Sequence, residues 1–109
     1  MLVTIQQIQI GATTFIEKEI ASKAVGFQKF ATYFVLPKIG KAIPEYINRI
    51  RDNPMAKDFF SDNGSVDLDE VYNISKQAIQ KSGQFTIYGV ILGETDIDKM
   101  YEYIKSVSA

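Results

Sequence analysis

The chain has 109 residues and a net charge of −1, and it contains neither cysteine nor histidine. The lack of cysteine excludes disulfides, thiol catalysis and zinc sites built on thiolates. The lack of histidine excludes catalytic triads that use it as the base. A hydrophobic fraction of 46% is ample for a packed core, so we expect a single compact domain over residues 1–109.

Charge is divided unevenly along the chain. Residues 1–57 hold eight Lys/Arg and four Asp/Glu, a net of +4, whereas residues 58–109 hold four Lys and nine Asp/Glu, a net of −5. Such a division favours pairing between the halves, within one chain or between subunits, or attraction of a polyanion by the first half. The alternative is that folding brings the two halves together, so that the folded molecule has no separation of positive and negative charge.

The N-terminal third predicts a long helical region. Residues 2–10 fit both a strand and a helix, but from Thr14 onward apolar residues recur every three or four positions. We expect this helix to end near Leu36, before Pro37. Its aromatic stripe is predicted to face the core, because a small domain needs its large side chains inside; a binding face is the alternative. The stripe consists of Phe15, Phe27, Phe30 and Phe34.

Further elements follow from turn and cap signals. Pro44 either kinks or begins a second helix, and Pro54 opens a short one. A helix is expected over residues 68–82, ended by Gly83. The segment 84–93 reads as a strand or as a hairpin turning near Tyr88, and a final helix follows it. The predicted class is therefore α+β and helix-rich, with a mainly α fold as the alternative.

The stretch SDNGSVDLDEVY at residues 61–72 resembles the second half of a calcium-binding loop. Asn63, Asp67 and Glu70 would be its ligands around a turn at Gly64, but Phe59 occupies the position of the first, anchoring aspartate. The same letters have a simpler explanation as a helix start. Asp67 can cap, with Glu70 completing a capping box. We therefore expect no metal and no cofactor, and keep these three residues as the calcium alternative.

A related pattern occurs twice. VDLDEVY at residues 66–72 aligns with TDIDKMY at residues 95–101, an offset of 29 residues. Because helix starts obey shared capping rules, two of them look alike without any common origin. Thr95 or Asp96 is then the expected cap of the final helix.

A basic stretch in the first half is the candidate interaction surface. It could be a solvated face, a docking surface for protein or a nucleic-acid contact, but a sequence pI of about 5.3 is low for a nucleic-acid binder. An edge of the predicted β element is a second possible contact. The basic residues are Lys38, Lys41, Arg49, Arg51 and Lys57.

The start of the chain has no basic segment followed by a continuous apolar run, and so it does not read as a signal peptide. The most apolar stretch, residues 24–36, is too short and too polar to span a bilayer. We therefore expect a cytoplasmic protein. Its isoleucine-rich composition, with lysine favoured over arginine, suggests a bacterial or phage genome.

By elimination, the sequence predicts a non-enzymatic interaction or regulatory protein that self-associates or binds a protein partner. There is no catalytic constellation and no phosphate- or dinucleotide-binding glycine motif. A nucleic-acid-associated protein using residues 38–57 is the first alternative. A calcium-binding loop at residues 61–70 is the second, and an interfacial membrane helix at residues 14–36 is the last.

Overall fold

The computed structural model describes residues 1–61 and 63–109 and, of these, all side chains except those of Met55 and Lys57. It confirms a helix-rich α+β fold. Four α-helices are described: α1 (Ile5–Ile16), α2 (Gly26–Arg51), α3 (Leu68–Ser82) and α4 (Glu94–Ser108). A π-helical turn, η1 (Glu17–Ala21), extends α1, and a 3-10 helix, η2 (Pro54–Phe59), follows α2. The strands are β1 (Leu2–Thr4), β2 (Ser65–Asp67), β3 (Phe85–Ile87) and β4 (Val90–Leu92).

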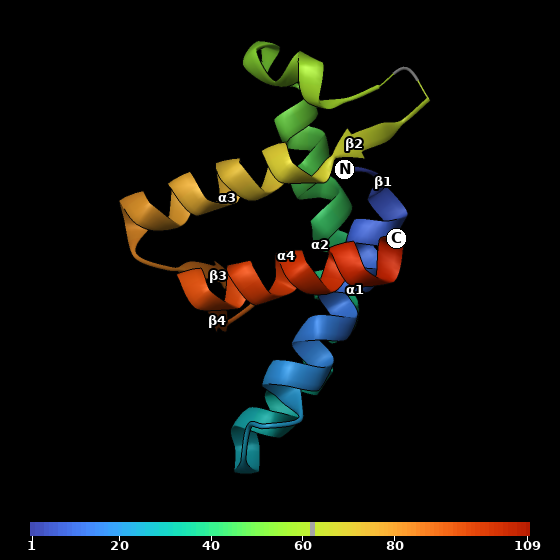
Figure 1. The fold of residues 1–109 in the computed structure, drawn as a ribbon. Helices are drawn as coiled ribbons and strands as arrows, with labels where there is room; N and C mark the ends of the chain where they lie inside the picture. The colour runs from blue at the N-terminus through green and yellow to red at the C-terminus, as the bar shows by residue number, and fades with distance from the viewer. Residues whose placement is uncertain (62) are drawn as a thin grey trace.

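The helices form two antiparallel pairs (Figure 1). α1 and α2 make a long hairpin, while α3 and α4 lie side by side across it and run in opposite directions. The closed end of the α1–α2 hairpin, in blue and teal, projects beyond α4. The molecule is correspondingly elongated, with extents of 44 × 29 × 21 Å.

The ambiguous residues 2–10 contain both a strand and a helix. β1 pairs antiparallel with β2, so that Val3 lies opposite Val66, and both side chains are buried. α1 starts immediately after β1 through a capping box. The Thr4 hydroxyl accepts a hydrogen bond from the Gln7 backbone N–H, and the Gln7 side chain accepts one from the Thr4 N–H.

The prediction of one helix from residue 14 to 36, ended by Pro37, is wrong. The chain leaves the helix after Ala21 and re-enters it at Gly26, where φ is +61°. α2 then continues through both Pro37 and Pro44. Proline is costly inside a helix because it leaves the carbonyl four residues earlier without its helical donor.

The neighbouring helix relieves that cost at Pro44. The carbonyl it leaves is that of Gly40, which accepts a hydrogen bond of 2.6 Å from the side-chain amide of Gln9 in α1. At Pro37 the carbonyl left is that of Tyr33, and both residues are exposed, so water can satisfy it. A tertiary contact thus overrides the local preference of proline.

We predict that Gln9→Leu destabilises the fold by about 1–3 kcal/mol, because the Gly40 carbonyl would lose its donor in a partly buried position. Gln6→Leu is the matched control, since Gln6 lies exposed on the same helix. Urea unfolding followed by circular dichroism measures both variants. Equal stability of the two would contradict this role for Gln9.

The predicted C-terminal elements are confirmed, with corrections to the caps. Gly83 ends α3 at φ +86°, and Tyr88 and Gly89, both with positive φ, form the two-residue turn between β3 and β4. Asp67 caps α3, but its side chain accepts from the N–H of Asp69 and not from that of Glu70. The expected cap of α4, Thr95 or Asp96, is wrong: the cap is Gly93, so α4 starts two or three residues earlier, and Asp96 accepts from the Gly93 backbone N–H.

The described part of the chain has two hydrophobic core clusters. One lies around the β1–β2 end and includes Val66 and Ile47, while the other lies under the β3–β4 hairpin and includes Ile16 and Ile39. All four of these side chains are at most 1% exposed. Ile43 and Met100 pack against both clusters and join them.

Candidate functional site

The clearest surface feature is a row of exposed aromatic side chains at the start of α2. Phe27, Phe30 and Phe34 are 82%, 70% and 66% exposed, and Val25 beside them is 81% exposed. The prediction that this stripe faces the core is correct for Phe15, which is buried, and wrong for the three phenylalanines of α2. We call Phe27, Phe30 and Phe34 the aromatic face.

The opposite side of α2 explains why these rings are left outside. Thr32, Leu36 and Ile39 form a second stripe with helical spacing, and all three are buried against the rest of the protein. A helix on the surface of a small domain buries only one of its sides. Because the smaller residues occupy the inner side, the phenylalanines face outward.

The predicted basic residues fall on more than one surface. On an ideal helix of 100° per residue, Lys38, Lys41 and Arg49 share the side of α2 that also carries the aromatic face. The Lys38 ammonium lies 5.5 Å from the centre of the Phe34 ring. Arg51 points elsewhere, with its guanidinium 4.8 Å from the ring of Phe60.

The outward side of α2 is therefore aromatic in its first half and basic in its second. Glu45 lies between the cations on the same side, as the sequence indicates. The side chain of Lys57, the fifth predicted basic residue, lies outside the described part of the chain.

The residues of the calcium alternative take part in turns and caps. Asn63 accepts hydrogen bonds from the Ser61 hydroxyl and the Ser65 N–H, and Asp67 caps α3. Glu70 is half-buried in the first turn of α3. Over residues 1–61 and 63–109, no group of three or more acidic side chains is gathered in a way that could hold a metal ion.

The repeated sequence pattern has a structural explanation. Tyr72 of α3 donates a hydrogen bond to Asp98 of α4, and Tyr101 of α4 donates one to Asp69 of α3. The two rings stack with their centres 4.2 Å apart. Asp69 and Tyr72 are related to Asp98 and Tyr101 by the 29-residue offset, so equivalent residues exchange partners across an approximate two-fold axis. We call this arrangement the tyrosine–aspartate brace.

Lys76 extends the brace on one side. Its ammonium lies 2.7 Å from a carboxylate oxygen of Glu94 and 2.8 Å from one of Asp98. Hydrogen bonding to Asp98, and then to Glu94, raises the pKa of Lys76. The Lys76 ammonium, and after it the Tyr72 hydroxyl, lower the pKa of Asp98.

The brace predicts a particular pH profile of stability. The hydrogen bond to Asp69 raises the pKa of Tyr101 from 10.0 to about 12, so its contribution is complete below pH 10 and is lost as pH rises toward 12. The pKa values of Asp69 and Asp98 are lowered from 3.8, so their contribution is present above about pH 4 and is lost as pH falls further.

We expect Tyr101→Phe to remove much of the alkaline loss, measured as the melting temperature between pH 9 and pH 12. Tyr88→Phe is the control, because Tyr88 is an exposed tyrosine of the β3–β4 turn. If both variants kept the alkaline slope of the unmodified protein, the Tyr101–Asp69 bond would not be its source.

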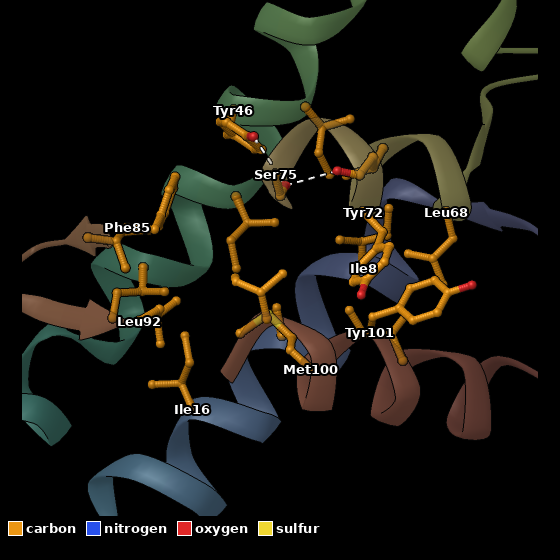
Figure 2. Close-up of a pocket in the computed structure, with 18 residues that line it drawn as sticks. Ile8, Ile16, Tyr46, Leu68, Tyr72, Ser75, Phe85, Leu92, Met100 and Tyr101 are labelled. Atoms are coloured by element: carbon orange, nitrogen blue, oxygen red, sulfur yellow. Dashed lines mark hydrogen bonds between the residues drawn. The ribbon is translucent and has the colours of Figure 1, made fainter. Parts of the chain in front are cut away.

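A second candidate site lies at the seam between the two core clusters. It is a partly open cavity of about 110 Å³. Figure 2 shows side chains around it from Phe85 and Leu92 at one end to Leu68 and Tyr101 at the other, with Met100 between them.

The sequence indicated Phe27, Phe30 and Phe34 as a stripe but placed that stripe on the buried side of the helix. The second stripe, Thr32, Leu36 and Ile39, was the signal that could have shown which side is buried. No sequence pattern predicts the cavity, because it depends on how side chains from all four helices meet.

Within the described residues, no helix combines the length and the apolar character needed to cross a membrane. Comparisons of the chain with protein-family models, with curated proteins and with solved structures give no significant match.

Proposed function

We propose that this chain is a non-enzymatic protein-interaction module that self-associates through the aromatic face of α2. The observation that supports this is the outward orientation of three phenylalanines at positions i, i+3 and i+7, each at least 66% exposed. A contiguous apolar patch of this kind is typical of interaction sites, whereas single exposed apolar residues are common on any surface.

The area of the patch fits a dimer. At about 200 Å² for a fully exposed ring residue, the aromatic face presents roughly 440 Å². With Val25, two copies that buried all of this area would cover about 1,100 Å² in total. That value is just below the range of about 1,200–2,000 Å² for stable protein interfaces, so we expect a weak dimer that dissociates on dilution.

Charge around the patch supports a second copy as the occupant. If two α2 helices pair antiparallel, Phe27 of one meets Phe34 of the other. Lys38 and Lys41 then approach η1 of the second copy, where Glu17 is exposed and Glu19 pairs with Lys23 at 2.6 Å. The mixed charge of this segment argues against an anionic membrane surface, which favours an apolar face with a basic rim.

The test is the molar mass in solution, measured by light scattering during gel filtration over a wide range of protein concentration. We expect the mass of two chains at high concentration, approaching that of one chain on dilution. The mass of a single chain at every concentration would overturn the proposal. Absorbance at 260 nm reports copurified nucleic acid, which would favour the alternative that uses residues 38–57.

A further inference from the structure

We propose that the cavity between the four helices is a binding site for a small, uncharged, apolar molecule of about the size of one benzene ring. Protein interiors contain few voids larger than a water molecule. The volume of about 110 Å³ exceeds that limit, and it approaches the engineered apolar cavity of roughly 150 Å³ that binds benzene or xenon.

The lining of the cavity selects the class of ligand. Among the side chains that the structure describes, no charged one contributes to the lining, and only Tyr46, Tyr72, Ser75 and Tyr101 carry polar groups there. The other lining residues are aliphatic, methionine or phenylalanine, and Ile16, Ile39 and Ile43 are among them.

The polar groups of the lining are already paired within the protein. The Tyr46 hydroxyl lies 3.3 Å from the Ser75 hydroxyl, which also donates to the carbonyl of Val71 at 2.9 Å (Figure 2). The hydroxyls of Tyr72 and Tyr101 donate to carboxylates in the tyrosine–aspartate brace. A bound water needs two to four polar partners, so an apolar molecule is the better occupant.

The residues around the cavity hold its walls in place and allow part of its lining to adjust to a ligand. The brace holds α3 against α4 over one wall, through the stacked rings of Tyr72 and Tyr101. Met100 lies near the middle of the lining, and its flexible thioether can adjust to different shapes. Phe85 and Ile87 at the hairpin end are half-buried, and so are Tyr72 and Tyr101 at the other end, so the lining reaches solvent at both ends.

The experiment uses benzene and xenon as probes and records the methyl NMR signals of isoleucine. In the unmodified protein we expect shifts at Ile16, Ile39 and Ile43, with a dissociation constant for benzene on the order of 1 mM. Ile10 and Ile91 are internal controls, because both are exposed and neither lines the cavity.

A variant that fills the cavity provides the matched comparison. Ser75→Leu places apolar volume inside it and is expected to weaken benzene binding about tenfold or more, whereas Ala78→Leu adds similar volume at an exposed position of the same helix and leaves binding unchanged. Ala12→Val is a second filling variant in case Ser75→Leu does not fold.

The methyl shifts of the unmodified protein test the proposed binding site without any variant. Unchanged cavity methyls at saturating benzene and under xenon pressure would overturn the inference. Shifts confined to residues beside the aromatic face would overturn it too, because they would place the apolar molecule on the surface. The site does not depend on the proposed self-association, since Phe27, Phe30 and Phe34 do not line it.

Discussion

Phe30→Asp is expected to convert the dimer into a monomer. Phe30 is the middle residue of the aromatic face and is 70% exposed, so in a symmetric pair both copies carry the change near the two-fold axis. Loss of a central aromatic side chain costs at least about 2 kcal/mol of binding free energy, and a carboxylate repeated in both copies adds repulsion. We expect the dimer dissociation constant to rise by roughly 100-fold or more.

The stability of the isolated chain should barely change in this variant. Substitutions at exposed positions without special contacts usually alter the free energy of unfolding by about 0.5 kcal/mol or less. Loss of dimer with an unchanged melting temperature, recorded at a concentration where both proteins are monomeric, would therefore locate the effect at the interface. A large drop in melting temperature would instead show that Phe30 supports the fold.

Ile91→Asp is the matched control for Phe30→Asp. Ile91 is a large apolar residue of β4, is 57% exposed and lies away from the aromatic face. It also tests the β edge, the other contact surface that the sequence suggests. Light scattering should give the mass of a dimer for Ile91→Asp and of a monomer for Phe30→Asp. The reverse result would move the interface to the β3–β4 hairpin.

Gly11→Ala should lower stability, and Gly40→Ala should raise it. A Cβ added at Gly11 would lie 2.8 Å from Cγ1 of Ile104, a buried side chain of α4, so that side chain or one of the two helices would have to shift. Added volume in a packed core costs typically about 1–3 kcal/mol. At Gly40 the nearest atom is the Thr13 hydroxyl oxygen at 3.7 Å, an ordinary contact.

The local preference is the same at both positions. Alanine in a helix interior is more favourable than glycine by about 0.5–1 kcal/mol, and both glycines lie within helices. The opposite signs of the two changes in the free energy of unfolding therefore come from the close approach of α1 to α4. Denaturant titrations of the two variants measure these changes. A stabilised Gly11→Ala protein would show that α1 and α4 accommodate the added methyl group without loss of stability.

Local sequence signals were sufficient wherever neighbours along the chain make the decisive contact. Asp67 before α3, Gly83 after it and the Tyr88–Gly89 turn all follow from the backbone conformations and short-range hydrogen bonds that those residues favour. The capping box of Thr4 and Gln7 also has a Thr-x-x-Gln spacing that is present in the sequence, but the pattern of residues 2–10 did not distinguish a strand from a helix.

The two prolines of α2 show where rules based on neighbouring residues fail. The sequence predicts a helix end at Pro37 and either a kink or a helix start at Pro44, and α2 neither ends at Pro37 nor starts at Pro44. Gln9, 31 residues from Gly40, supplies the hydrogen bond that Pro44 removes. No local pattern announces such a contact, because it exists only once α1 and α2 pack together.

The sequence by itself determined the class of the fold, the caps of α3, the turn at Tyr88 and Gly89, and the existence of an aromatic stripe, since these depend on spacing within a few residues. The tertiary structure alone decided that Phe27, Phe30 and Phe34 face outward, that Asp69 and Tyr72 exchange partners with Asp98 and Tyr101, and that a cavity remains between the helices. The physical reason is that a residue pattern fixes which side chains share a face of a helix. Which face is buried, and how well it is filled, depends on every other helix in the domain.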